Sequence, residues 1–122
     1  MAQNRRPRVP LAHVHRFAPE ERDIYLLCPQ FKSVSQLFRS GERFWEWEQA
    51  APGEISFNHA VAIGDFGIGS DAPVILDYRP DPPQPCVLRL RYEYVPGPPP
   101  TTVTHWVGVA RCFDEFADML GL

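Results

Sequence analysis

The stretch VLRLRYEY, residues 87–94, decides the fold class of this chain. Its side chains alternate between two sets: Leu88, Leu90, Tyr92 and Tyr94 on one side, and Val87, Arg89, Arg91 and Glu93 on the other. Successive side chains of a β-strand point to opposite faces. The alternation therefore predicts a strand of an antiparallel sheet, with one buried face and one solvated face.

Further strand patterns flank this one on both sides. The segments between them are rich in proline or glycine, which favour turns. Residues 80–85 and 96–100 predict hairpin loops, and residues 64–71 predict a glycine-rich loop. The predicted strands are residues 24–27, which end before Pro29, and residues 60–63, 73–79 and 102–110. Together they indicate a meander of about four to six strands.

Helical patterns lie at the two ends of the predicted sheet. Ser33 is a candidate N-cap for a helix over 33–38, with Gln36 as its capping-box partner and Gly41 as its end. Residues 42–51 predict a second helix that stops at Pro52-Gly53. Residues 112–120 predict a C-terminal helix, closed by Gly121, with its apolar stripe at Phe113, Phe116, Ala117 and Leu120. The order predicts an α+β fold: an antiparallel sheet packed against helices.

Charge divides the chain into a basic start and an acidic remainder. The only charged side chains of residues 1–19 are four arginines, whereas residues 20–122 hold 8 basic and 15 acidic side chains, a net charge of −7. We predict a flexible basic tail over residues 1–18 and a single domain over 19–122. The acidic domain disfavours nucleic acid as the main ligand and suits a basic protein partner.

The cysteines favour a cytoplasmic protein without a metal or a cofactor. Cys28, Cys86 and Cys112 are widely spaced, form no C-x-x-C pair and lie beside apolar residues, as buried free thiols do in a reducing compartment. No apolar run has the roughly 18 residues of a membrane helix. His13 and His15 lack a neighbouring cysteine, so zinc is not expected.

The glycine-rich loop is the first candidate site. Its G-x-x-G-x-G pattern lacks the lysine of a phosphate-binding loop and precedes no helix, so a tight chain reversal is the favoured interpretation. Ser70 and His105, with Asp71 or Asp77, form a conceivable hydrolase triad, but no G-x-S-x-G motif supports it. Asp65, Asp71 and Asp77 either cap turns or form an acidic rim for a basic partner.

Trp45 and Trp47 form the second candidate site. A short helix can bury at most one of these two rings fully, and an exposed tryptophan near charged residues is typical of an interface. We therefore expect the two tryptophans, with Asp65 and Asp71, to border a partner-binding face. The alternative is that both rings belong to the core and that both acids cap the loop.

Two blocks of the sequence resemble the SUKH superfamily, named partly for a yeast cell-wall regulator linked to killer-toxin resistance. The first is AVAIGDFGIGSDAPVILDYR, residues 60–79, and the second is HWVGVARCFDEF, residues 105–116. Members show a strand, a glycine loop and a Leu-Asp strand, followed by a strand and a Phe-x-x-Phe helix. Gly67, Gly69, Asp71 and Asp77 match that pattern. The Leu-x-x-Asn-Gly-Gly segment with which members often open is not evident in this chain.

The resemblance implies a non-catalytic bacterial immunity protein that neutralises a toxin, in some cases a nuclease, by stoichiometric binding. No catalytic residues carry over, because the family is not known for catalysis. An adaptor for an endogenous protein is the second hypothesis, and a small hydrolase or nucleotide-binding enzyme is the third. A neighbouring toxin gene would separate the first two hypotheses. A melting shift with nucleotides or metal ions would favour the third.

Overall fold

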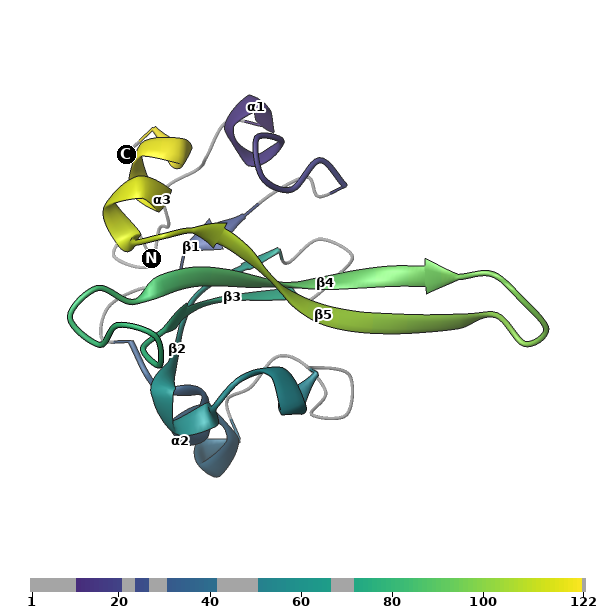
Figure 1. The fold of residues 1–122 in the computed structure, drawn as a ribbon, viewed down its shortest axis with the longest axis horizontal. Helices are drawn as coiled ribbons and strands as arrows, with labels where there is room; N and C mark the ends of the chain where they lie inside the picture. Colours follow the sequence, from purple (N-terminus) through teal and green to yellow (C-terminus); the bar gives the residue numbers. More distant parts are fainter. Residues whose placement is uncertain (1–10, 21–23, 27–30, 42–50, 67–71, 122) are drawn as a thin grey trace, which may run out of the picture.

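The described part of the chain forms a five-stranded antiparallel sheet with helices on both faces, as the computed structural model shows in Figure 1. The structure describes residues 11–20, 24–26, 31–41, 51–66 and 72–121. The strands follow one another in the order β1-β2-β3-β4-β5, so the sheet is a meander with β1 and β5 at its edges. The predicted α+β class, with an antiparallel sheet and a C-terminal helix, is confirmed.

The strands lie close to their predicted positions. Each pairs antiparallel with the next, and β4 and β5 form the longest pair, with Val95 opposite Thr101 near its tip and Val87 opposite Ala110 at its base. The strands are β1 Tyr25–Leu26, β2 Ala60–Phe66, β3 Ala72–Asp77, β4 Cys86–Val95 and β5 Thr101–Ala110.

Helices cover the sheet from two sides. In Figure 1, α1 and α3 lie on one side of the sheet, whereas α2 and the short 3-10 helices lie on the other. They are α1 Leu11–Val14, α2 Val34–Ser40, η3 Pro52–Glu54, η4 Phe57–His59 and α3 Phe113–Leu120. The sheet is therefore the middle layer of the fold.

The predicted ends of α2 are confirmed in detail. Ser33 Oγ accepts the backbone N–H of Gln36 at 3.1 Å, and Gln36 Oε1 accepts the backbone N–H of Ser33 at 2.9 Å. This reciprocal capping box satisfies two amides that the first helical turn leaves without a partner. Gly41 ends the helix at φ +73°, a left-handed conformation that glycine adopts without steric cost.

The C-terminal helix packs as its apolar stripe predicts. Phe116 and Leu120 are 1% and 2% exposed, whereas Phe113, at the start of the stripe, is 43% exposed. The ring of Phe116 also meets the ring of Phe17 edge to face, at 5.7 Å between centroids. Gly121 ends the helix at φ +75°, as predicted.

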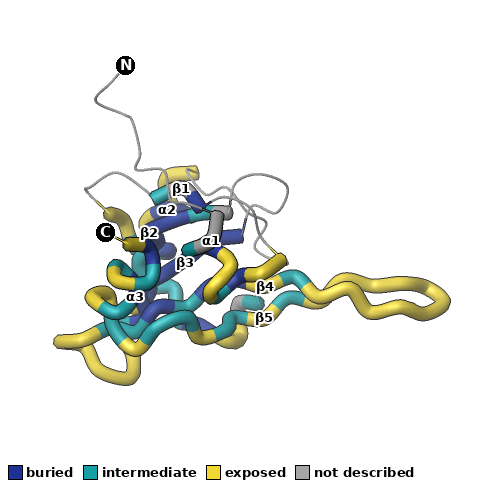
Figure 2. The backbone as a smooth tube through the Cα atoms, turned by 90° about the horizontal axis from the view of Figure 1, so that it is seen from above, coloured by how far each residue is buried: buried dark blue, intermediate teal, exposed yellow. Residues whose placement is uncertain are grey.

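Strand β4 buries the predicted face only in its first half, where Leu90 is 0% exposed, and there it buries side chains of the other face as well. Val87 and Arg89, from the set expected in solvent, are 0% and 3% exposed, whereas Tyr94 is 66% exposed. Arg89 forms a 2.7 Å ion pair with Glu20, which follows α1 in sequence. The first half of β4 is therefore covered on both faces, because helices pack on both sides of the sheet, while its second half extends beyond them (Figure 2).

Two predicted boundaries change in the structure. Gly64, Asp65 and Phe66 belong to β2 and not to a loop, because a bulge between Ala62 and Gly64 lets the strand stay paired with β3. Pro52-Gly53 opens η3, whereas residues 42–50 of the predicted helix lie outside the described residues.

The packed domain also reaches further toward the N-terminus than residue 19. Val14 and Ala18, assigned to the flexible tail from the sequence, are both 0% exposed and belong to the core. They are apolar side chains on either side of Arg16, and their burial in the core outweighs the polar character of the segment. Residues 1–10 lie outside the described residues.

Candidate functional site

The structure places two of the seven predicted site residues. Asp65 is half-buried within β2, where its backbone pairs with Tyr25 on one side and Pro73 on the other. Asp77 ends β3 and is 5% exposed. The other five lie outside the described residues: Trp45, Trp47, Gly67, Gly69 and Asp71.

The carboxylate of Asp77 is bound by the guanidinium group of Arg79. Arg79 Nε donates to Asp77 Oδ1 at 3.0 Å and Arg79 Nη2 donates to Oδ2 at 3.0 Å, a two-pronged contact. The backbone N–H of Arg79 adds a bond to Oδ1 at 3.1 Å. Burial raises the pKa of Asp77, but the hydrogen bonds from Arg79 outweigh it and hold the pKa below its ordinary value. Both carboxylate oxygens are therefore engaged within the chain, and Asp77 does not suit an acidic rim.

Glu54 connects three parts of the chain that are distant in sequence. Its Oε2 lies 2.9 Å from Nδ1 of His105, and its Oε1 accepts the backbone N–H of Trp106 at 2.7 Å. Its backbone carbonyl accepts a bond from Nη2 of Arg79 at 2.9 Å. The bond from His105 and then the bond from Trp106 lower the pKa of Glu54. Glu54 thus fastens η3 to β5 and to the end of β3.

His105 and Asp77, two residues of the conceivable triad, each bind a different partner. His105 is bound to Glu54 and Asp77 is bound to Arg79, so within the described ranges no hydrogen bond links His105 to Asp77. Ser70 and Asp71 lie outside those ranges. The cluster stabilises negative charge on two carboxylates.

Sequence reasoning missed Glu54, and no local signal identifies it. It lies just after a proline-glycine pair and shares no periodicity with its partners. The hydrogen bond to His105 spans 51 residues and the bond to Trp106 spans 52. Only the folding of η3 against the edge of the sheet brings these groups together.

The most exposed part of the structure is the outer half of the β4–β5 hairpin, residues 91–105, which we call the arm. Figure 2 shows it extending beyond the rest of the chain as an almost wholly exposed segment. Tyr94 is 66% exposed, Val95 40% and Val103 37%. Its charged side chains are Arg91 and Glu93, one of each sign. The arm therefore presents apolar and neutral surface to solvent.

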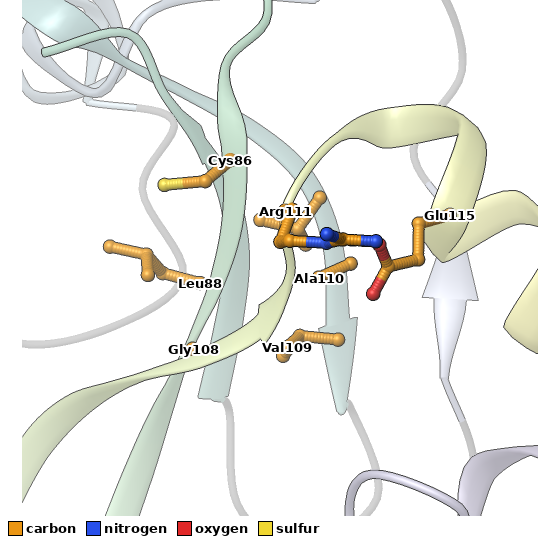
Figure 3. A pocket seen from close by; sticks show the side chains of 8 residues that line it. Cys86, Leu88, Gly108, Val109, Ala110, Arg111 and Glu115 are labelled. Carbon is orange, nitrogen blue, oxygen red and sulfur yellow. The ribbon is translucent and has the colours of Figure 1, made fainter. Parts of the chain in front are cut away.

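A shallow pocket of about 330 Å³ lies at the opposite end of the same hairpin (Figure 3). It is open to solvent, and Arg111 and Glu115 form a 3.0 Å ion pair at its border. Burial and then the charge of Asp77 raise the pKa of the Cys86 thiol, which therefore stays protonated near neutral pH. Its lining is Cys86, Val87, Leu88, Gly108, Val109, Ala110, Arg111 and Glu115.

The described residues contain no group of three or more His, Cys, Asp or Glu side chains arranged to hold a metal ion. None of the helices in these same ranges is long and apolar enough to cross a membrane.

Comparison with known proteins returned no match of any kind. No family model matches the chain, and no curated protein or solved structure is similar to it.

Proposed function

We propose that this protein is a non-catalytic protein-binding module, and specifically a cytoplasmic immunity protein that neutralises a bacterial toxin by stoichiometric binding. The resemblance of residues 60–79 and 105–116 to the SUKH superfamily supports the toxin-binding role. The exposed arm is the observation that carries the binding role. An acidic domain remains suited to a basic partner.

We place the arm at the centre of the proposed binding surface, and Asp77, which is bound by Arg79, is not part of that centre. Large apolar side chains in solvent, such as Tyr94, are typical of protein interfaces, in which tyrosine is enriched. The paired strands hold the backbone of the arm, so little conformational entropy is lost when a partner binds. Trp45, Trp47, Asp65, Gly67, Gly69 and Asp71 remain predicted contributors from the sequence.

The arm also favours a protein over a nucleic acid as partner. Nucleic-acid affinity depends on several lysine or arginine contacts to phosphates. The arm offers Arg91 alone, with Glu93 beside it and an ion pair from Arg91 Nε to Glu20 at 3.6 Å. Its surface suits apolar contact with a folded protein.

Affinity capture from the native cell tests the proposal. The full chain is used as bait, the bound protein is identified, and the complex is rebuilt from purified components to measure its stoichiometry. The same capture is repeated with Tyr94→Ser/Val103→Ser. Phe31→Ser is the matched control, because Phe31 is an exposed apolar side chain outside the arm whose exposure, 44%, lies between those of Val103 and Tyr94.

We expect a partner in a one-to-one complex that the arm variant loses and the Phe31 variant keeps. The partner should stop growth when expressed alone, and co-expression of this chain should restore it. A partner that is harmless alone would favour the adaptor hypothesis. A partner bound equally well by the arm variant would remove the arm from the binding surface.

A further inference from the structure

Strand β5 is an open edge of the sheet along the arm. An edge strand carries one row of backbone N–H and C=O groups that face away from the sheet, and such a row can pair with another strand. Thr101, Thr102 and Val103 of this strand are exposed. The described part of the chain provides no strand beyond β5.

The contact between Glu54 and Trp106 shows which amides point outward. The N–H of Trp106 binds a side chain outside the sheet, at 2.7 Å, so it points away from β4. Backbone N–H groups alternate in direction along a strand, and no bulge interrupts residues 101–107. The N–H groups of Thr102 and Thr104 therefore point outward, and those of Val103 and His105 point toward β4.

Two features limit the open row. Pro100, just before β5, has no N–H to donate. At the other end, the N–H of Trp106 is already bound to Glu54. The outward donors that remain on β5 within the arm are the amides of Thr102 and Thr104.

We propose that the arm is a self-association surface, at which β5 pairs antiparallel with β5 of a second copy about a two-fold axis at Val103. Thr102 of each copy then lies opposite Thr104 of the other copy, which gives two Thr102–Thr104 pairs. Each pair exchanges both of its N–H···O=C bonds. Val103 lies opposite its own counterpart in a non-hydrogen-bonded pair, in which facing side chains are closest.

Pro100 and the bound amide of Trp106, which lie at the two ends of the open row, favour this register over the neighbouring ones. An axis at Thr102 would place Thr104 opposite Pro100, which lacks a donor. An axis at Thr104 would place Thr102 opposite Trp106, whose amide belongs to Glu54. An axis at Val103 uses every open donor of β5 in the arm of both copies, and this self-complementarity favours a second copy over an unrelated strand.

Charge and shape are compatible with that pairing. Glu93 is paired with Val103 within one copy, so the two Glu93 side chains would lie on opposite outer strands of the joined sheet. His105 would face Thr101 of the other copy, so no like charges become direct neighbours. The arm projects away from the helices, which leaves its edge accessible (Figure 2).

This association does not rest on the proposed toxin binding, although both use the arm, and sedimentation velocity on the full chain tests it. A concentration series of the wild type should show reversible monomer–dimer exchange. Thr104→Pro should weaken the dimer at least about tenfold, because it removes an outward N–H and places a ring in the pairing edge. Proline is tolerated on an edge strand where its nitrogen faces solvent, and Thr104→Ser, which keeps the amide, should dimerise like the wild type.

Amide hydrogen exchange of the wild type gives a second measurement that needs no variant. The amides of Thr102 and Thr104 should exchange more slowly as concentration rises. The amides of Val103 and His105, which point toward β4, should be protected at every concentration. This comparison decides the question if Thr104→Pro does not fold.

Three results would overturn the proposal. They are a chain that stays monomeric over the whole series, a folded Thr104→Pro variant that dimerises like the wild type, and Thr102 and Thr104 amides whose exchange does not depend on concentration.

Discussion

The carboxylate of Glu54 binds the backbone N–H of Trp106 at 2.7 Å and so closes the edge of β5 where the arm joins the rest of the sheet. The same carboxylate binds His105, and the backbone carbonyl of Glu54 binds Arg79. One acidic residue therefore both anchors η3 and ends the open edge. Free edges invite pairing with other chains, and a charged side chain at the edge is a known way to limit it.

Replacing Glu54 should change how stability depends on pH. Its pKa is lowered in the folded state by His105 and then by Trp106. The stabilisation is therefore complete above the pKa of the unfolded chain and is lost as pH falls through the folded pKa. Urea unfolding of the wild type should show a steeper loss of stability than Glu54→Gln between about pH 5 and pH 3.

At neutral pH the Glu54→Gln variant should lose about 0.5–1 kcal/mol, because the pair with His105 is partly exposed. Glu115→Gln is the matched control, since its pair with Arg111 is also near the surface but touches no strand edge. Identical pH profiles for the wild type and Glu54→Gln would contradict the role assigned to Glu54.

Asp77→Asn should destabilise the protein more than a surface substitution does. The change removes the negative charge to which Arg79 donates two side-chain hydrogen bonds, and Asp77 is only 5% exposed. We expect a loss of about 1.5–3 kcal/mol, the range for hydrogen bonds to charged groups. Denaturant unfolding of Asp77→Asn, Arg79→Met and the double variant measures the coupling. Additive losses would show that the two side chains do not act together.

Phe116→Ala should cost about 3–5 kcal/mol, because it leaves a cavity under a ring that is 1% exposed. Phe113→Ala provides the comparison within the same helix. Its ring is 43% exposed, so its removal should cost far less. Equal losses in equilibrium unfolding would mean that α3 does not bury its stripe as described.

Two truncations should behave differently. A chain that begins at Leu11 should melt within a few degrees of the full chain, because residues 1–10 show no apolar periodicity. A chain that begins at Pro19 also loses Val14 and Ala18, both of which are fully buried, so its melting temperature should fall much further. Thermal unfolding followed by circular dichroism compares them. A large loss in the first truncation would show that residues 1–10 are needed for stability.

Local chemistry explains the features that sequence reasoning predicted well. The capping box of Ser33 and Gln36 and the end at Gly41 depend on neighbouring residues alone. The stripe that buries Phe116 repeats within one short helix. The strands of the meander follow from apolar runs between proline and glycine, and nearest neighbours in sequence become nearest neighbours in the sheet.

Burial along β4 followed from packing and not from its pattern. The alternation of residues 87–94 correctly predicts a strand, yet Val87 and Arg89 are buried and Tyr94 is exposed. A period of two residues shows only that two faces differ in polarity. Which face is covered, and over what length, depends on where distant helices pack and on where Glu20 meets Arg89.

The sequence by itself determined the class of the fold and the ends of α2 and α3, because these follow from patterns and caps that are local in the sequence. The tertiary structure alone decided that Glu54 closes the edge at Trp106 and that the arm stands in solvent. Those features depend on groups as much as 52 residues apart, and no local pattern encodes a distance between them.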